Sequence, residues 1–168
     1  MEVQIKDNKI YAPLKDKWLV VKPEEKVRQR YICRLVDSYG YDINQMDQEL
    51  KVTNSHRGQG SARADIVIWK SAQEKKYNKS AFIIVECKAE SVTIRKEDYY
   101  QGYNYAAWAG ADFFVTTNLK ETRIFKVVKG ELPKKLEEIV DIPTADMANN
   151  EKKVKELLNQ TKAFTRDE

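Results

Sequence analysis

The sequence of 168 residues predicts an α/β fold in which a mixed β-sheet is flanked by helices. Two segments, 64–69 and 81–88, are short, β-branched and almost continuously apolar, as is typical of strands buried in a sheet. Two others, 23–40 and 95–109, carry apolar residues at helical spacing. The expected order of elements is helix, three strands, helix and two strands, which favours an α/β sandwich.

The composition indicates a globular protein and excludes several other classes. Hydrophobic residues make up 42% and charged residues 33% of the chain, and 30 basic against 26 acidic side chains leave a net charge of +4. This small basic excess permits nucleic acid as a partner without requiring it. No run approaches the ~18 apolar residues of a membrane span, and two cysteines are too few for a disulfide framework. We therefore expect a cytoplasmic protein with no membrane contact.

The first helix is expected to begin at Pro23 and to end at Gly40. Proline is favoured in the first turn of a helix because it lacks the N–H group that would have no helical partner there. Glu24 and Glu25 follow in the same turn, where a negative charge is stabilised by the helix dipole. These signals agree on where the helix starts.

Between this helix and the first clear strand, the sequence favours an extended segment and then a loop. Residues 41–53 are expected to be extended, and residues 54–61 contain two glycines. No Lys-Ser or Lys-Thr pair follows these glycines, so the pattern of a phosphate-binding loop is not satisfied. A turn is the expected structure, and a DNA-backbone contact through Arg57 or Arg63 is the alternative.

The two apolar segments 64–69 and 81–88 are expected to form an antiparallel pair. The polar connection between them, 70–80, is too short for a crossover helix. The elements expected beyond this pair are a helix over 95–109, strands over 111–117 and 122–128, a charged stretch over 132–140 and a tail helix around 151–158.

Charged residues at the ends of this strand pair carry the chemical signal. Asp65 lies at the start of one apolar strand, where a carboxylate is tolerated only if something pairs with it. Glu86 and Lys88 end the other strand on one face, while Cys87 points to the opposite face. If the pair is in register, Asp65 can approach Glu86. Two close carboxylates repel unless a divalent cation lies between them, and hard oxygen ligands suit Mg²⁺.

This pattern resembles the PD-(D/E)XK nuclease superfamily, in which an Asp precedes a strand ending in Glu-x-Lys. Here the matching residues are Asp65, Glu86 and Lys88. Two flanking motifs narrow the resemblance to the N-terminal domain of the type I restriction enzyme R subunit. Pro-Glu-Glu-Lys-Val-Arg-Gln at 23–29 is similar to the first-helix motif of that group, and Gln-Gly-Tyr-Asn-Tyr at 101–105 fits its Q-x-x-x-Y helix motif.

The resemblance covers about residues 20–128 and implies a restriction-endonuclease-like αβββαβ core. It places the nuclease-fold domain at residues 1–130, and the rest of the chain, 131–168, is expected to be a C-terminal helical extension packed on the same domain. One departure is Ala64, which stands where the superfamily name has proline. That position contributes backbone and no ligand.

The resemblance also implies roles for the charged residues. Asp65 and Glu86 would hold Mg²⁺, with Mn²⁺ as a substitute, and Lys88 would act at the attacking water. A glutamate of the first helix, Glu24 or Glu25, would be an additional metal or water ligand. Glu24 is preferred because it lies three positions before the inward-facing apolar stripe of that helix.

Gln101 and Tyr105 lie four positions apart, hence on one helix face, and the resemblance directs them toward the catalytic strand and the DNA backbone. The implied activity is Mg²⁺-dependent hydrolysis of DNA phosphodiesters by a metal-dependent deoxyribonuclease. The expected partners are double-stranded DNA and helicase or specificity subunits in trans, because no Walker motif is present; a homodimer stays open. The alternative is a non-catalytic DNA-binding or assembly module of a restriction-modification system that retains the nuclease fold.

Overall fold

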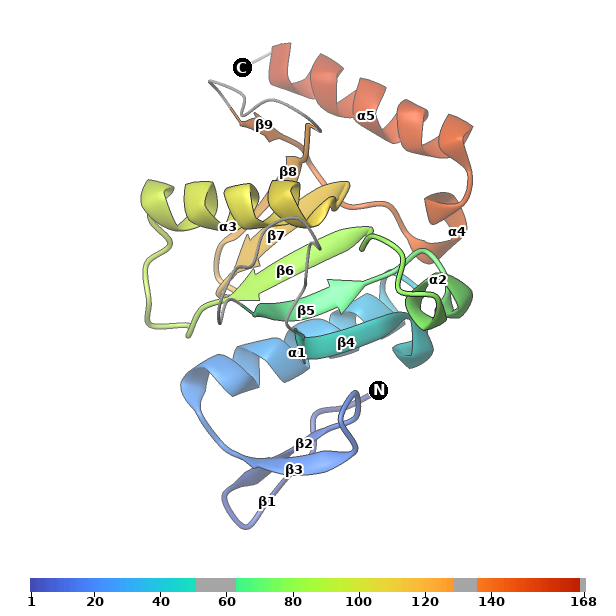
Figure 1. Ribbon diagram of the computed structural model, residues 1–168. Helices are drawn as coiled ribbons and strands as arrows, with labels where there is room; N and C mark the ends of the chain where they lie inside the picture. Colours follow the sequence, from blue (N-terminus) through green and yellow to red (C-terminus); the bar gives the residue numbers. More distant parts are fainter. Residues whose placement is uncertain (51–62, 129–135, 167–168) are drawn as a thin grey trace.

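A six-stranded mixed sheet forms the centre of the computed structural model, which describes residues 1–50, 63–128 and 136–166 (Figure 1). The strands β6 and β7 are parallel, and every other neighbouring pair among the described strands is antiparallel. The sheet thus confirms the expected mixed α/β architecture. In spatial order the strands are β4 (Met46–Leu50), β5 (Ala64–Ile68), β6 (Ile83–Cys87), β7 (Phe113–Thr117), β8 (Thr122–Lys126) and β9 (Glu137–Glu138).

Helix α1 (Pro23–Asp37) begins where the sequence predicts it. Pro23 lies in its first turn together with Glu24 and Glu25, and the charges of both glutamates are favourable near the positive end of the helix dipole. The helix ends at Asp37, slightly earlier than expected. The chain then turns through Gly40, whose φ of +76° lies in the left-handed region that favours glycine.

Two helices cover opposite faces of the sheet. Side chains alternate between the faces along each strand, so the apolar strands have two apolar faces, and each face is covered by one helix. Helix α1 packs its buried residues against strand residues such as Ile66 and Val85. Helix α3 (Lys96–Ala109) packs Tyr103 on the other face, against residues that include Phe114. The predicted helix over 95–109 is confirmed, and it ends at Gly110 as expected.

The chain beyond the sheet returns to the α1 face. Helices α4 (Ala145–Ala148) and α5 (Glu151–Arg166) follow β9, and Val154 and Leu158 of α5 lie partly buried against the core on that face. Figure 1 shows α5 extending along the β8–β9 side of the molecule. Among the described residues, no helix combines the length and apolar character needed to cross a membrane.

Two short helices correct the expectation of irregular connections. Helix α2 (Ala72–Lys76) lies within the segment 70–80, and the Ser71 side chain accepts a hydrogen bond from the backbone N–H of Glu74 at 3.1 Å. A Ser followed three residues later by Glu is an N-cap signal that could have predicted this helix. The segment 41–53 was expected to be extended, but it begins with a 3₁₀ turn, η1 (Ile43–Gln45), before β4; residues 51–53 lie outside the described chain.

A second sheet, which the sequence analysis did not predict, precedes α1. It consists of β1 (Ile5–Lys6), β2 (Lys9–Ala12) and β3 (Lys17–Val20), all antiparallel. The turn between β1 and β2 contains only Asp7 and Asn8, with φ of +52° and +60°. Two adjacent residues with positive φ are typical of a tight hairpin, and Asp and Asn tolerate that conformation best among residues with side chains.

Candidate active site

A cavity of about 340 Å³ opens at the end of the sheet where β5 begins and β6 ends. Because β5 and β6 are antiparallel, the start of one strand and the end of the other lie at the same edge. The cavity therefore gathers residues from α1, β5, β6 and α3. The residues of the sequence-based site that line it are Glu24, Arg63, Asp65, Glu86, Gln101 and Tyr105.

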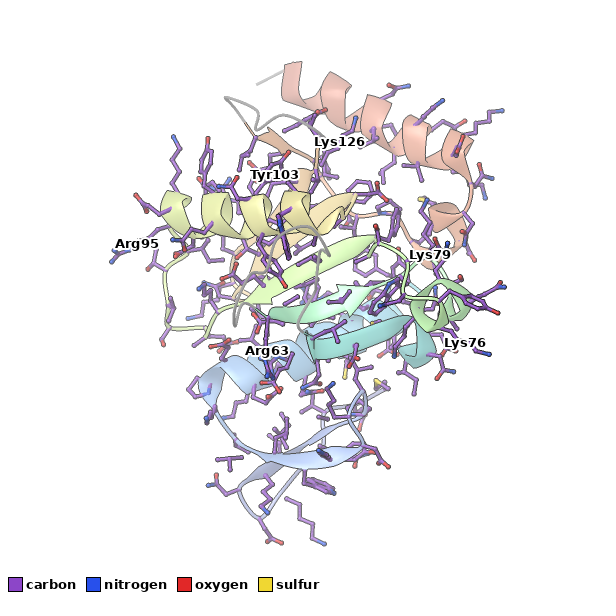
Figure 2. All side chains as sticks on the ribbon, viewed as in Figure 1. Arg63, Lys76, Lys79, Arg95, Tyr103 and Lys126 are labelled. Carbon is purple, nitrogen blue, oxygen red and sulfur yellow. The ribbon has the colours of Figure 1, made fainter. Side chains whose placement is uncertain are left out.

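The remaining members of the expected site lie elsewhere. Lys88 does not line the cavity but contacts Glu86, which does. Glu25 is buried inside the domain. Arg57 falls within 51–62, outside the described residues. Figure 2 shows Arg63 near the start of β5, and Arg63 lines the cavity.

The carboxylate of Asp65 is held from two directions. Its Oδ1 accepts a hydrogen bond from Arg28 Nη2 at 2.9 Å, and its Oδ2 accepts one from the backbone N–H of Cys87 at 2.8 Å. The described β5–β6 register ends at the pair of Ile66 and Val85, so Cys87 receives a side-chain acceptor where the ladder stops. This pairing is the reason that a carboxylate is tolerated at the start of an apolar strand.

Arg28 is the residue that the sequence analysis missed. Its side chain is only 6% exposed and contacts three carboxylates, at 2.7 Å to Glu25, 2.9 Å to Asp65 and 3.3 Å to Glu49. A guanidinium that is so deeply buried is tolerable only when paired. Glu49 has a φ of +50°, an unfavourable backbone conformation for a residue with a side chain.

The two adjacent glutamates of α1, Glu24 and Glu25, therefore lie in different environments. Glu25 accepts hydrogen bonds from Arg28 at 2.7 Å and from Gln29 Nε2 at 3.0 Å, and Gln29 also donates to Gln48 at 3.0 Å. Glu24 instead lines the cavity. Neighbouring residues on a helix point about 100° apart, which separates the two side chains.

Glu86 lies in close contact with helix α3. A Cβ added at Gly102 would clash with the ring of Phe114 and lie 2.6 Å from Glu86 Oε2, so only glycine permits this approach. On the other side, Glu86 Oε1 lies 3.0 Å from Lys88 Nζ. Cys87 points to the opposite face and is buried in the core, which confirms its expected position.

The pKa values of Glu86, Glu24 and Lys88 are shifted at this end. Burial raises the pKa of Glu86 despite the opposing effect of Lys88. Desolvation, followed by the charge of Asp65, raises the pKa of Glu24. Burial opposes the charge of Lys88, but the hydrogen bond and negative charge of Glu86 outweigh it and raise the pKa of Lys88. Burial is the first cause of the raised pKa of both glutamates, so added positive charge in the cavity would stabilise their ionised forms.

An unpartnered hydroxyl group lies beside Glu86. Thr116 of β7 is opposite Glu86 in the parallel β6–β7 register and is fully buried. Its Oγ1 has no hydrogen-bond partner among the described residues. Nothing in the sequence pattern distinguishes this threonine from other strand residues.

The donor chemistry at the cavity fits Mg²⁺, although a complete cluster is not formed. Glu24, Asp65 and Glu86 offer the hard carboxylate oxygens that Mg²⁺ prefers. Within the described ranges, however, no group of three or more His, Cys, Asp or Glu side chains is placed to hold a metal ion. In this arrangement Arg28 is paired with Asp65 and Lys88 with Glu86.

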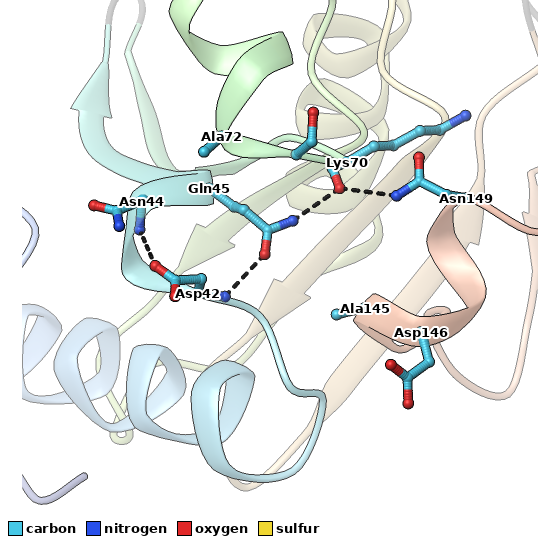
Figure 3. A pocket seen from close by; sticks show the side chains of 9 residues that line it. Asp42, Asn44, Gln45, Lys70, Ala72, Ala145, Asp146 and Asn149 are labelled. Atoms are coloured by element: carbon cyan, nitrogen blue, oxygen red, sulfur yellow. Dashed lines mark hydrogen bonds between the residues drawn. The ribbon is translucent and has the colours of Figure 1, made fainter.

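A larger hollow of about 440 Å³ lies at the other end of the β5–β6 hairpin. Gln45 Nε2 and Asn149 Nδ2 both donate to the backbone oxygen of Lys70, at 2.8 and 3.2 Å (Figure 3). Asp42 accepts from the backbone N–H of Asn44 at 2.8 Å. These bonds join η1, the β5–α2 connection and α4, so the polar groups here hold the fold together.

Comparisons with known proteins bear on the fold and the family of this chain. A solved fragment of an HsdR subunit, assigned to a type I restriction enzyme of Vibrio vulnificus YJ016, has the same fold, with a TM-score of 0.50 and 21% identity. The likeness covers 78% of this chain and 25% of that one. No curated protein matches the chain. The family model of the type I restriction enzyme R protein N-terminus matches residues 23–143, and the chain therefore belongs to that family.

Proposed function

We propose that this chain is a Mg²⁺-dependent deoxyribonuclease domain that hydrolyses phosphodiester bonds in double-stranded DNA. The observation that carries the proposal is the convergence of Glu24, Asp65 and Glu86 on one cavity, with Lys88 bonded to Glu86. Membership of the R-subunit N-terminal family supports the same reaction class.

In this proposal Asp65 and Glu86 hold Mg²⁺, or Mn²⁺ in its place, and Glu24 is an additional ligand. When bound, the metal ion supplies Lewis-acid polarisation of a phosphoryl oxygen and a water molecule of lowered pKa. The protein contributes preorganisation. The Cys87 N–H and the Arg28 guanidinium fix the orientation of Asp65, and Gly102 lets α3 support Glu86 from the opposite side.

Lys88 acts in the proposal as a charged hydrogen-bond donor. A protonated lysine offers three N–H donors and no lone pair, so it cannot itself be a metal ligand. From its place beside Glu86 it orients the attacking water or stabilises negative charge on a phosphoryl oxygen. Gln101, Tyr105 and Arg63 line the same cavity and would contact the DNA backbone.

The second candidate is a non-catalytic DNA-binding or assembly module that retains the fold. One observation favours it: both oxygens of Asp65 already accept hydrogen bonds, from Arg28 and from the Cys87 N–H. A carboxylate committed to internal contacts can be a structural group. This reading predicts no metal-dependent activity.

The partners that we propose are double-stranded DNA and other subunits of a restriction-modification system. A helicase or specificity subunit in trans would deliver the DNA, in the cytoplasm, and a homodimer would present two cavities to the two strands. Neither arrangement is required for the chemistry at a single cavity.

Plasmid cleavage tests the proposal. Supercoiled plasmid is incubated with the full chain in the presence of Mg²⁺, of Mn²⁺ or of EDTA, and nicked and linear products are measured. We expect cleavage with either metal and none with EDTA, and loss of cleavage in Glu86→Gln. Glu156→Gln, an exposed position on α5, is the matched control and should cleave like the wild type. Cleavage that persists in Glu86→Gln would contradict the proposal.

A further inference from the structure

One face of the N-terminal sheet is not covered by the rest of the described chain. Ile10 and Ala12 of β2 are fully buried, so the alternate residues of that strand point away from the domain. The sheet lies below α1 in Figure 1, at the side of the molecule away from α3. We call the uncovered surface the outer face. The strand registers assign to it Lys6, Lys9, Tyr11, Trp18 and Val20.

Two lysines of the outer face oppose each other. Lys6 and Lys9 are direct cross-strand partners, an arrangement in which like charges are destabilising. Among the described residues neither forms an ion pair. The nearest acids in sequence lie in the turns, Asp7 after β1 and Asp16 after β2, and Asp16 accepts a hydrogen bond from Tyr11. Lys6 and Lys9 are therefore not held by ion pairs within the described chain, and the carboxylate placed on this face, that of Asp16, is bound to Tyr11.

Protection of a sheet edge does not account for this pair. A lysine on an edge strand discourages pairing with another chain, which explains Lys6 on β1. Lys9, however, lies on β2, the central strand of the three. An acidic residue at that position would pair with Lys6, so the repulsion has no structural benefit within the domain.

The same face exposes apolar and aromatic surface. Trp18 is 44% exposed and Val20 is 58% exposed. The ring centroids of Trp18 and Tyr11 lie 5.3 Å apart, and this contact helps to orient the indole ring of Trp18. An exposed aromatic ring on the same face as two lysines without ion pairs matches the two requirements of single-stranded nucleic acid, which offers phosphates for ammonium groups and unpaired bases for stacking.

We propose that the outer face binds single-stranded nucleic acid, with Lys6 and Lys9 on the phosphates and Trp18 stacked on a base. This surface precedes residue 23, where the family match begins, and it does not depend on cleavage at the cavity. A protein partner would need acidic groups that neutralise the two lysines. The experiment below distinguishes such a partner from single-stranded nucleic acid.

Fluorescence anisotropy with a labelled 15-nucleotide oligo-dT tests the proposal, using the full chain in EDTA. The double variant Lys6→Gln/Lys9→Gln should bind more weakly and reduce the slope of log Kd against log salt by about 1.4, since each phosphate contact to a single strand contributes about 0.7. Trp18→Ala should weaken binding by about tenfold without changing that slope, because it removes stacking and no charge. Trp18→Phe should keep most of the affinity.

The matched control is Lys152→Gln/Lys153→Gln, which removes the same charge from exposed positions of α5. It should change the affinity far less than the Lys6 and Lys9 variant. The Lys6 and Lys9 variant should also unfold at a temperature no lower than the wild type, because a repulsion is removed. If Lys6→Gln/Lys9→Gln and Trp18→Ala both bind oligo-dT as tightly as the control variant, the proposal is overturned and a protein partner is favoured. EDTA prevents cleavage, so oligo-dT binding is measured independently of the nuclease activity. A chain that cleaves plasmid but does not bind oligo-dT would contradict only this proposal. A chain that binds oligo-dT but does not cleave plasmid would contradict only the proposed nuclease function.

Discussion

The two ends of the β5–β6 hairpin both contain polar hollows, and their chemistry differs. At the larger hollow, Gln45 and Asn149 donate hydrogen bonds to Lys70, and Asp42 accepts one from a backbone N–H. At the smaller cavity, carboxylates crowd together, and burial is the largest cause of the raised pKa of Glu86. The proposed cation site rests on the chemistry of the cavity end, where Glu24, Asp65 and Glu86 line one cavity.

The largest effect on stability is expected from Arg28, whose buried guanidinium pairs with Glu25 and Asp65 at the cavity end. Arg28→Met should lower the free energy of unfolding by about 3–5 kcal/mol, because it leaves the buried Glu25 and the partly buried Asp65 without their counter-ion. Urea unfolding measures the change. Arg30→Met on the same helix is the control, since its contact with Glu90 at 3.2 Å is exposed and should contribute no more than ~1 kcal/mol. Equal effects of the two variants would show that the buried network does not hold this end together.

The next effect is expected at Lys88, and it concerns the reaction. Lys88→Ala should lower single-turnover cleavage by about 10²-fold or more, the usual scale for one positioned catalytic group, while Mn²⁺ still binds. Lys88→Arg should not restore the rate, because a wide planar fork does not replace a compact ammonium. Rates are measured at saturating Mg²⁺. If Lys88→Ala cleaves as fast as the wild type, Lys88 is only a counter-ion of Glu86.

A smaller effect is expected at Gly102. Alanine normally stabilises a helix interior relative to glycine by about 1 kcal/mol, but here its Cβ would meet Phe114 and Glu86. Gly102→Ala should therefore destabilise the domain by about 1–3 kcal/mol and displace the Glu86 carboxylate. Thermal unfolding and the cleavage rate report the two effects. Asn104→Ala, at an exposed position of the same helix, should do neither. A stabilised and fully active Gly102→Ala would show that α3 does not support Glu86.

Much of the fold follows from local patterns in the sequence. The apolar runs predicted β5 and β6 and their antiparallel pairing, and the helical periodicity predicted α1 and α3. Two local signals in the sequence indicate the short elements that lie before and between these segments. They are the Ser71 cap of α2 and the Asp7-Asn8 turn of the N-terminal sheet.

The site was predictable only in part, for a physical reason. Strand alternation and antiparallel pairing are enough to bring Asp65 toward Glu86. The contacts of Arg28 with Glu49 and Asp65 join α1 to two different strands, and no local period encodes such tertiary pairing. The choice between Glu24 and Glu25 likewise depends on the rotation of α1 against the sheet, which places Glu24 at the cavity and Glu25 on Arg28.

Calorimetric titration with Mn²⁺ tests the central claim most directly, that the crowded carboxylates of the cavity end form the metal site. The wild type should bind Mn²⁺, whereas Asp65→Asn and Glu86→Gln should each lose most of that binding. The control is Asp42→Asn at the larger hollow, which keeps an N-cap acceptor and should bind like the wild type. Undiminished Mn²⁺ binding in both cavity variants would contradict the account.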